Sequence, residues 1–189
     1  FTTYHWTKVF ADKDSYKTFV QPLINSVLCA VLSCAIAILV GGLFAYLVIR
    51  TDMRGKKFCS SLFMLLYIMP AWTLAIAWTN FFKNQMVGGA MGLFEAVTGL
   101  STPNWFAYGL FPVVVVTGLH YSPYAYILIG GILRNMDSNL EEAAQILKAS
   151  RARIFWRVTI PLVRPAIMST ILLVFASGLS VFSTAQFLG

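Results

Sequence analysis

A histidine lies within a long apolar run, and its neighbours can donate and accept hydrogen bonds. His120 is followed by Tyr121, Pro123 and Tyr124 in a stretch that contains no carboxylate. An imidazole within an apolar layer is costly unless it is paired, so these residues are candidates for lining a pathway through a membrane. The other interpretation is a neutral ring bonded to a neighbouring helix. Metal coordination in this span would need carboxylates or thiolates nearby, so we expect neither a bound metal nor a cofactor.

The second informative stretch, residues 134–165, is rich in Lys, Arg and Glu and lies between two apolar runs. Ser138 and Glu141 have the spacing of a capping box, which predicts that a helix begins there. Its apolar face would be formed by Leu140, Ala143, Ala144 and Leu147. A second helical piece is predicted over 151–159, ended by Ile160 and Pro161.

Two short helices with an apolar face and a charged rim suit docking into a groove of a partner protein. The alternative is an amphipathic loop that rests on lipid headgroups and is held there by its arginines. The residues alone favour docking only slightly over lipid contact.

The elements that position these residues are predicted to be membrane-spanning helices. The chain is 58% hydrophobic and 11% charged, whereas soluble domains carry roughly 25% charged residues. Crossing the ~30 Å hydrocarbon core takes about 20 apolar residues. The predicted spans are 25–49, 58–82, 107–133 and 166–189. We therefore expect an all-α, polytopic transmembrane bundle in residues 25–189.

Breaks and flanking segments complete this prediction. Pro70 lies near the middle of the second span and predicts a kink or a break there, which is either structural or part of a gate. A short helix is expected around 91–97. Residues 1–24 mix aromatic and charged side chains, which suits a periplasmic or interfacial segment. The last apolar run reaches residue 189, so we expect the chain to be a fragment of a longer protein.

The distribution of positive charge predicts the orientation. Ten of the 14 Lys and Arg residues lie in the two loops 50–57 and 134–165. Short loops that are rich in Lys and Arg face the cytoplasm, so both loops are expected there. The net charge of +7 is thus explained by topology, and no nucleic-acid partner is expected.

The spacing within the charged loop resembles the EAA loop of permeases of binding-protein-dependent ABC importers, whose pattern is E-A-A-x-x-x-G-x9-I-x-L-P. Glu142 takes the Glu position, Val158 the apolar position, and Ile160-Pro161 the Leu-Pro position. Lys148 stands where the family has Gly, and a lysine in the left-handed region costs about 1–2 kcal/mol. The chain is expected either to continue the helix past this position or to turn in another way.

This resemblance implies a type I ABC importer permease in a bacterial inner membrane. The implied partners are cytoplasmic ABC ATPase subunits, a second permease subunit or half, a periplasmic substrate-binding protein, and membrane lipid. The implied docking residues are Glu141, Glu142, Ala143, Ala144, Leu147, Lys148, Ala149, Ser150, Phe155, Val158, Ile160 and Pro161. Glu142 would cap its own helix or pair with a basic group of the ATPase. Pathway candidates are Pro70, His120, Tyr121, Pro123 and Tyr124.

The substrate is less well indicated than the class. Residues 118–137 are similar to permeases of the iron(III) uptake group, while polyamine, sulfate and phosphonate importers have similar sequences. The chain has no G-x-x-x-x-G-K-[ST] phosphate loop, so ATP hydrolysis would belong to a partner. Two other classes remain as alternatives: an intramembrane enzyme that uses His120 with Ser122, and a passive channel.

Overall fold

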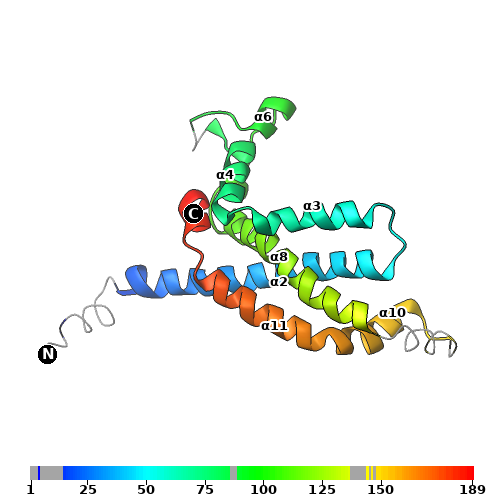
Figure 1. Ribbon diagram of the computed structural model, residues 1–189. Coiled ribbons are helices and arrows are strands. Elements are labelled where there is room, and N and C mark those ends of the chain that lie inside the picture. Colours follow the sequence, from blue (N-terminus) through cyan, green and yellow to red (C-terminus); the bar gives the residue numbers. More distant parts are fainter. Residues whose placement is uncertain (1–3, 5–14, 86–88, 137–143, 145, 147) are drawn as a thin grey trace.

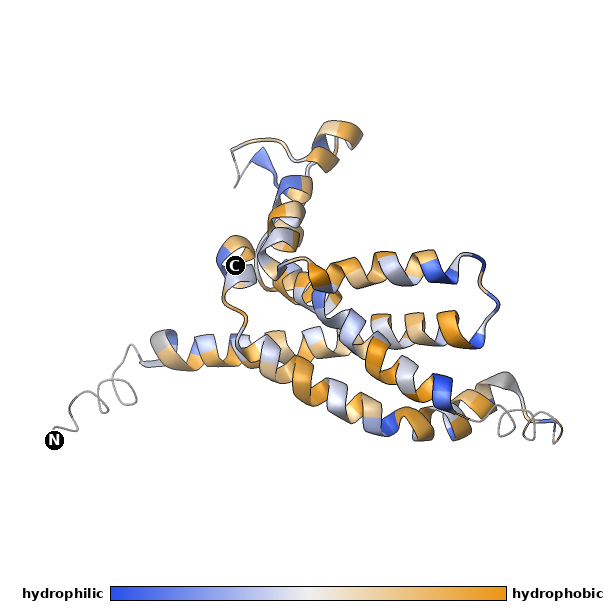
Figure 2. Ribbon diagram, viewed as in Figure 1, coloured by the Kyte–Doolittle hydropathy of each residue, from blue (hydrophilic) through white to orange (hydrophobic). Residues whose placement is uncertain are grey.

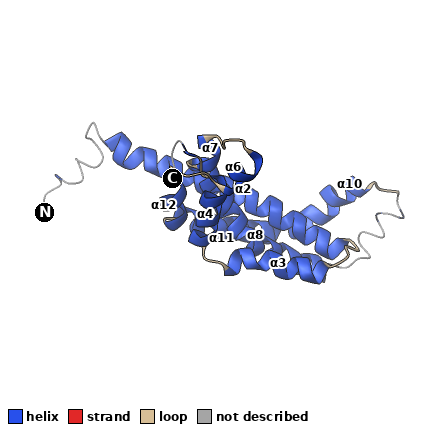
Figure 3. Ribbon diagram, turned by 90° about the horizontal axis from the view of Figure 1, so that it is seen from above, coloured by secondary structure: helices blue, strands red, loops and turns tan. Residues whose placement is uncertain are grey.

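The computed structural model describes residue 4 and residues 15–85, 89–136, 144, 146 and 148–189. All regular elements in this part are helical, and it contains no strand (Figure 3). They are α2 (Gln21–Arg50), α3 (Lys56–Ile68), α4 (Ala71–Phe82), α6 (Leu93–Thr98), α7 (Asn104–Ala107), α8 (Leu110–Asn135), α10 (Arg151–Ile154), α11 (Ile160–Leu179) and α12 (Ser183–Leu188), with π-helical turns η1 (Tyr16–Val20) and η2 (Phe155–Thr159). The all-α prediction is confirmed.

Helices α2, α8 and α11 form the central bundle, and α3 lies along α8 (Figure 1). Three helical stretches are long and apolar enough to cross a membrane: 21–50, 104–135 and 152–179. The bent pair α3–α4 makes a fourth span if it is counted as one. These findings agree with the prediction of about four spans.

The close approach of α2 and α8 depends on small residues. A Cβ atom on Gly41 would overlap the carbonyl oxygen of Ser122 and the side chain of Ala125. Ser33 Oγ donates a hydrogen bond to the Val114 carbonyl, with 3.1 Å between the oxygens. In a membrane, where the hydrophobic effect does not drive helix association, such backbone proximity and interhelical hydrogen bonds stabilise the pair.

The second predicted span is broken into two helices. Helices α3 and α4 meet at Met69 and Pro70 with a bend of 99°. At 1.5 Å per residue, the 13 residues of α3 reach only about 20 Å, which is less than the hydrocarbon thickness. Of the two predicted alternatives at Pro70, a kink or a break, the structure has the break. Residues 58–82 do not form a single kinked helix.

The last predicted span has different boundaries. Helix α11 begins at Ile160 and continues from α10 and η2, so a helical stretch runs without interruption over 152–179. The prediction that Ile160 and Pro161 end a loop helix was wrong, because Pro161 lies in the first turn of α11 and the helical stretch passes through it from η2. The chain then breaks before the short α12.

The two ends of the bundle differ in charge. At one end α2 ends, α3 and α10 begin, and α8 ends; we call it the basic end. Its exposed basic residues include Arg54, Lys56, Lys57, Arg134 and Arg153. Figure 2 shows hydrophilic colours at this end and mostly apolar colours along the helices between the ends. At the other end, α4, α7 and α12 contact α8, and α6 contacts α4.

Candidate functional site

The break between α3 and α4 leaves the last backbone carbonyls of α3 without helical partners, and that of Leu66 is one of them. The carbonyl of Leu66 would bond to the N–H of residue 70, but Pro70 has no N–H. The ring of His120, on α8, takes this place: its Nδ1 lies 2.8 Å from the Leu66 oxygen. Because a carbonyl oxygen only accepts, Nδ1 carries the proton in this hydrogen bond. The side chain of His120 is 8% exposed.

The proline within α8 creates a second such carbonyl. Pro123 removes the donor that the Leu119 carbonyl would have in a regular helix. The hydroxyl of Ser122 donates to this oxygen instead, at 2.7 Å. Ser122 Oγ and His120 Nδ1 are therefore both bonded to backbone carbonyls, an arrangement that does not match a serine–histidine nucleophilic pair.

Aromatic side chains surround this histidine. The hydroxyls of Tyr67, on α3, and Tyr124, on α8, are hydrogen-bonded at 2.7 Å. The Tyr67 ring lies 4.6 Å from that of Tyr124 and 5.9 Å from that of His120, measured between centroids. The Tyr121 ring lies 4.8 Å from that of His120. We call His120, Tyr67, Tyr121 and Tyr124, with the Leu66–Pro70 turn, the break site.

A cavity of about 610 Å³ opens beside the break site. It is lined by Ala71, Tyr121, Ala176, Ser177, Ser180, Val181, Phe182 and Ser183. The α3–α4 break, Tyr121 of α8 and the α11–α12 break therefore meet at one place. Transporters build substrate sites where discontinuous helices meet near the bilayer midplane, since unwound backbone is tolerated where it lines a cavity. The break site contains four of the five pathway candidates, namely Pro70, His120, Tyr121 and Tyr124. The fifth candidate, Pro123, lies within the same turn of α8.

The charged loop contains a left-handed residue at the position that the sequence singled out. Lys148 has φ of 58° and is the only non-glycine residue with positive φ in the described part of the chain. The N–H of Ala149 donates to the carbonyl of Ala144 at 3.1 Å, which is the 6→1 bond of a Schellman helix end. The helix containing Ala144 therefore ends at Lys148, where the family has its glycine, and does not continue past it.

The next residues begin a new helix. Ser150 Oγ accepts a hydrogen bond from the N–H of Arg153 at 3.4 Å, which is the N-cap arrangement for α10. Ile154 is buried, and the Phe155 ring packs edge-on against Tyr46 of α2, with 5.5 Å between centroids. This helical piece was predicted over 151–159, and α10 with η2 confirms it.

The other docking candidates are described only in part. Glu141, Glu142, Ala143 and Leu147 lie outside the described residues, as do Ser138 and most of the first predicted helix. Val158 and Ile160 are half-buried and Pro161 is exposed. We call the described residues 144, 146 and 148–161 the loop segment. Ile146, which was not among the candidates, is 81% exposed.

The family was identified by comparison with known proteins. The model of the family described as "Binding-protein-dependent transport system inner membrane component" matches residues 37–189. The chain belongs to this family. It is thus an integral membrane protein of a transport-system family, and the match includes both the break site and the loop segment.

Individual relatives name two different substrates. The maltose/maltodextrin transport system permease protein MalF of Salmonella typhimurium is 28% identical over 188 residues, which are 97% of this chain and 36% of MalF. The putative ferric transport system permease protein FbpB 1 of Haemophilus influenzae is 33% identical over 91 residues, which are 48% of this chain and 14% of that protein. The chain thus spans about a third or less of these relatives.

A solved structure shows the same fold. A bacterial ABC transporter involved in the import of the acidic polysaccharide alginate contains a chain that aligns with a TM-score of 0.75 at 16% identity. The alignment covers 96% of this chain and 63% of that one. The type I permease architecture expected from the charged loop is therefore present.

Sequence reasoning missed several residues of the break site. Leu66 and Tyr67 were not singled out because their partners lie 54 and 57 residues away in the chain. Three serines line the cavity at intervals of three positions: Ser177, Ser180 and Ser183. In a helix this spacing places hydroxyl groups on one face, so the pattern could have been noticed in the sequence. Within the described residues, no three His, Cys, Asp or Glu side chains come together.

Proposed function

We propose that this chain is part of the permease of an ATP-driven importer. In this proposal the break site and its cavity form part of the substrate pathway, and the loop segment binds a cytoplasmic ATPase. The observation that carries the proposal is the uninterrupted helix over 152–179, which is about 42 Å long. One end of this helix belongs to the loop segment, and the other reaches Ser177 in the wall of the cavity.

The mechanism follows from this connection. A force on the loop segment, exerted by nucleotide-driven closure of an ATPase dimer, would move α11 as one body. Movement of α11 relative to α8 changes the cavity between Ser177 and Tyr121, which lie on these two helices. Alternating access requires such a packing of helices with two arrangements, biased by a ligand at a distance.

The proposed orientation places the basic end in the cytoplasm. Ten Lys and Arg residues lie in loops 50–57 and 134–165, against four elsewhere in the chain. The opposite end, with α6 and α7, would then face the periplasm and receive substrate from a binding protein. A second permease subunit or half would complete the pathway, as the resemblance to importer permeases implies.

For the substrate, two candidates have specific support. Iron(III) is supported by the similarity to the ferric permease relative over 91 residues. A carbohydrate is supported by the longer match to MalF and by the lining of the cavity, where one tyrosine and three serines offer hydroxyl groups and an aromatic face. Binding of both ligands to the partner binding protein, measured by calorimetry, distinguishes them.

The docking role is tested in the full-length permease with Glu142→Lys. If Glu142 contacts the ATPase, the ATPase no longer co-purifies and transport falls at least about tenfold, as for loss of a buried charged contact. Asp52→Lys is the matched control, because Asp52 is an exposed acid in the other loop of the basic end, and it is expected to leave both unchanged. Full ATPase binding and transport with Glu142→Lys would refute the docking role.

A further inference from the structure

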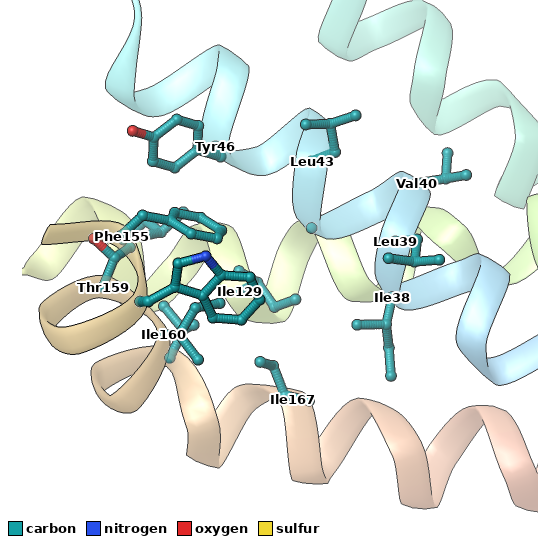
Figure 4. Close-up of a pocket in the computed structure, with 14 residues that line it drawn as sticks. Ile38, Leu39, Val40, Leu43, Tyr46, Ile129, Phe155, Thr159, Ile160 and Ile167 are labelled. Carbon is teal, nitrogen blue, oxygen red and sulfur yellow. The ribbon is translucent and has the colours of Figure 1, made fainter. Parts of the chain in front are cut away.

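An apolar groove runs along the outside of the bundle next to the basic end. It has a volume of about 500 Å³ and is lined by α2, α8, η2 and α11, with Leu39, Leu43, Trp156, Ile160 and Ile167 among its walls. Figure 4 shows the side chains of α2 and of α11 on opposite sides of the groove, with Tyr46 and Phe155 at one end. Leu39 and Leu43 are 70% and 62% exposed, so the groove is open to the surroundings of the bundle.

The length and position of the groove match one leaflet of a bilayer. Along α2 it extends from Ile38 to Tyr46, which is about 12 Å at 1.5 Å per residue. One leaflet contributes about half of the ~30 Å hydrocarbon core. Arg50 lies one helical turn beyond Tyr46, so the groove begins just inside the basic end. The upper part of an acyl chain would fit along this length, in parallel to the helices.

Positive charge borders the end of the groove at which a lipid headgroup would lie. Arg153 precedes Trp156 by three residues and is therefore on the same face of the helix. Arg50 follows Tyr46 by four residues, on the face of α2 that lines the groove. Arg157, next to Trp156, is exposed. Of the described residues at the basic end, Asp52 is the only acidic one.

We propose that this groove binds an anionic phospholipid, with one acyl chain between α2 and α11 and the phosphate near Arg153 and Arg157. Guanidinium groups pair with phosphate through two parallel hydrogen bonds, and Trp is favoured at the level of headgroups. Trp156 is 67% exposed, which suits this position. A helix of a second permease is the competing occupant, but it would have to bring acidic side chains to the edge of the apolar layer to match the arginines, where they are costly.

The proposal is tested by quenching of tryptophan fluorescence in the full-length permease, assembled in its transporter and reconstituted in phosphatidylcholine vesicles. Every tryptophan except Trp156 is replaced by Phe, and a small fraction of the lipid is brominated phosphatidylglycerol or brominated phosphatidylcholine. Each arginine near the surface enriches an anionic lipid about fivefold, so with Arg153 and Arg157 the brominated phosphatidylglycerol is expected to quench Trp156 at least about fivefold more effectively. A variant that keeps only Trp72, which is 46% exposed on α4, is the control and should show no such preference.

Two substitutions separate the parts of the site. Gly42 lines the groove, so Gly42→Phe fills it and should abolish the preference. Arg153→Gln should reduce the preference, whereas Lys57→Gln, at the same end but in the wall of a different cavity, should not. Equal quenching by the two lipids, or no quenching of Trp156 by either because a protein helix covers it, would overturn the proposal. Native mass spectrometry of the unsubstituted transporter, counting retained phosphatidylglycerol with and without Gly42→Phe, gives the same answer if the tryptophan variants fail to fold.

Discussion

The break site and the loop segment both interrupt helices, but they are held in different ways. At the break site, the Leu66 carbonyl is bonded by His120, a residue of another helix 54 positions away. In the loop segment, the chain turns at Lys148 through bonds between residues three to five apart, at Ala149 and Ser150. A locally bonded turn moves as a unit. A turn bonded across helices changes whenever these helices move relative to each other.

This difference assigns separate roles to the two regions. The loop segment can transmit a displacement into α11 without unfolding, since its hydrogen bonds move with it. The break site cannot follow a shift between α3 and α8 unless the Leu66 carbonyl finds another donor, because an unsatisfied carbonyl in the apolar layer costs several kcal/mol. The hydrogen bond between Leu66 and His120 therefore opposes relative movement of these two helices.

The largest expected effect is at the break site, in His120→Leu. The leucine fills a similar volume but leaves the buried Leu66 carbonyl without a donor. The free energy of unfolding should fall by about 1–3 kcal/mol, with transport strongly reduced. Denaturation of the purified permease in mixed micelles measures the stability.

The control for this variant is His120→Asn. An asparagine amide can place a donor near the position of Nδ1, so it should recover part of the stability that leucine loses. Equal losses in both variants would mean that the ring contributes by packing and that the hydrogen bond to Leu66 contributes little.

In the loop segment, Ser150→Ala is expected to cost about 1 kcal/mol, because it removes the N-cap of α10. The loss should appear as faster hydrogen exchange of the first amides of α10 and should leave the amides of α3 unchanged. Ser169→Ala is a matched control, since the Ser169 hydroxyl bonds to the Pro165 carbonyl within α11 and caps no helix start. Faster exchange in α3 with Ser150→Ala would contradict the local character of the segment.

Lys148→Gly should stabilise the protein by up to about 1 kcal/mol. Glycine adopts the observed φ of 58° without the steric cost that a lysine carries. Lys148→Val should destabilise the protein, since β-branched residues are least compatible with positive φ. A loss of stability with glycine would show that the lysine side chain has contacts that outweigh the backbone strain.

The smallest expected effect is that of Tyr67→Phe, which removes the hydroxyl pair with Tyr124. Interhelical hydrogen bonds in membrane proteins contribute about 0.6 kcal/mol on average, so the loss should be of this size. Tyr124→Phe should cost the same, and the double variant little more than either alone. Additive losses would show that the two hydroxyls act separately.

Much of this fold could be predicted from the sequence because the signals are local. Charge-free apolar runs predict the helices, Pro70 predicts a kink or a break in the second span, and residues 142–161 predict the family. The helix boundaries near Pro161 were missed, because a proline usually ends or kinks a helix, whereas here the helical stretch continues through it.

The contacts of the break site could not be predicted in the same way. Pro70 reveals which carbonyl loses its donor, namely Leu66, but not which residue replaces it. That residue comes from α8, and only packing of α3 against α8 brings His120 to the carbonyl. Likewise, the sequence indicated that a left-handed backbone at Lys148 would be unfavourable. It did not decide whether the chain turns at this residue.

The central claim is that His120 replaces the donor that Pro70 lacks, and a double-mutant cycle tests it directly. The free energies of unfolding are compared for the unsubstituted permease, Pro70→Ala, His120→Leu and the double variant. Met69 is extended here, with ψ of 135°, and Pro70→Ala lets α3 continue past it, so that the alanine N–H takes the helical position and bonds to the Leu66 carbonyl. His120→Leu should therefore cost about 1–3 kcal/mol when Pro70 is present and close to nothing in the Pro70→Ala background. The same cost in both backgrounds would contradict the account.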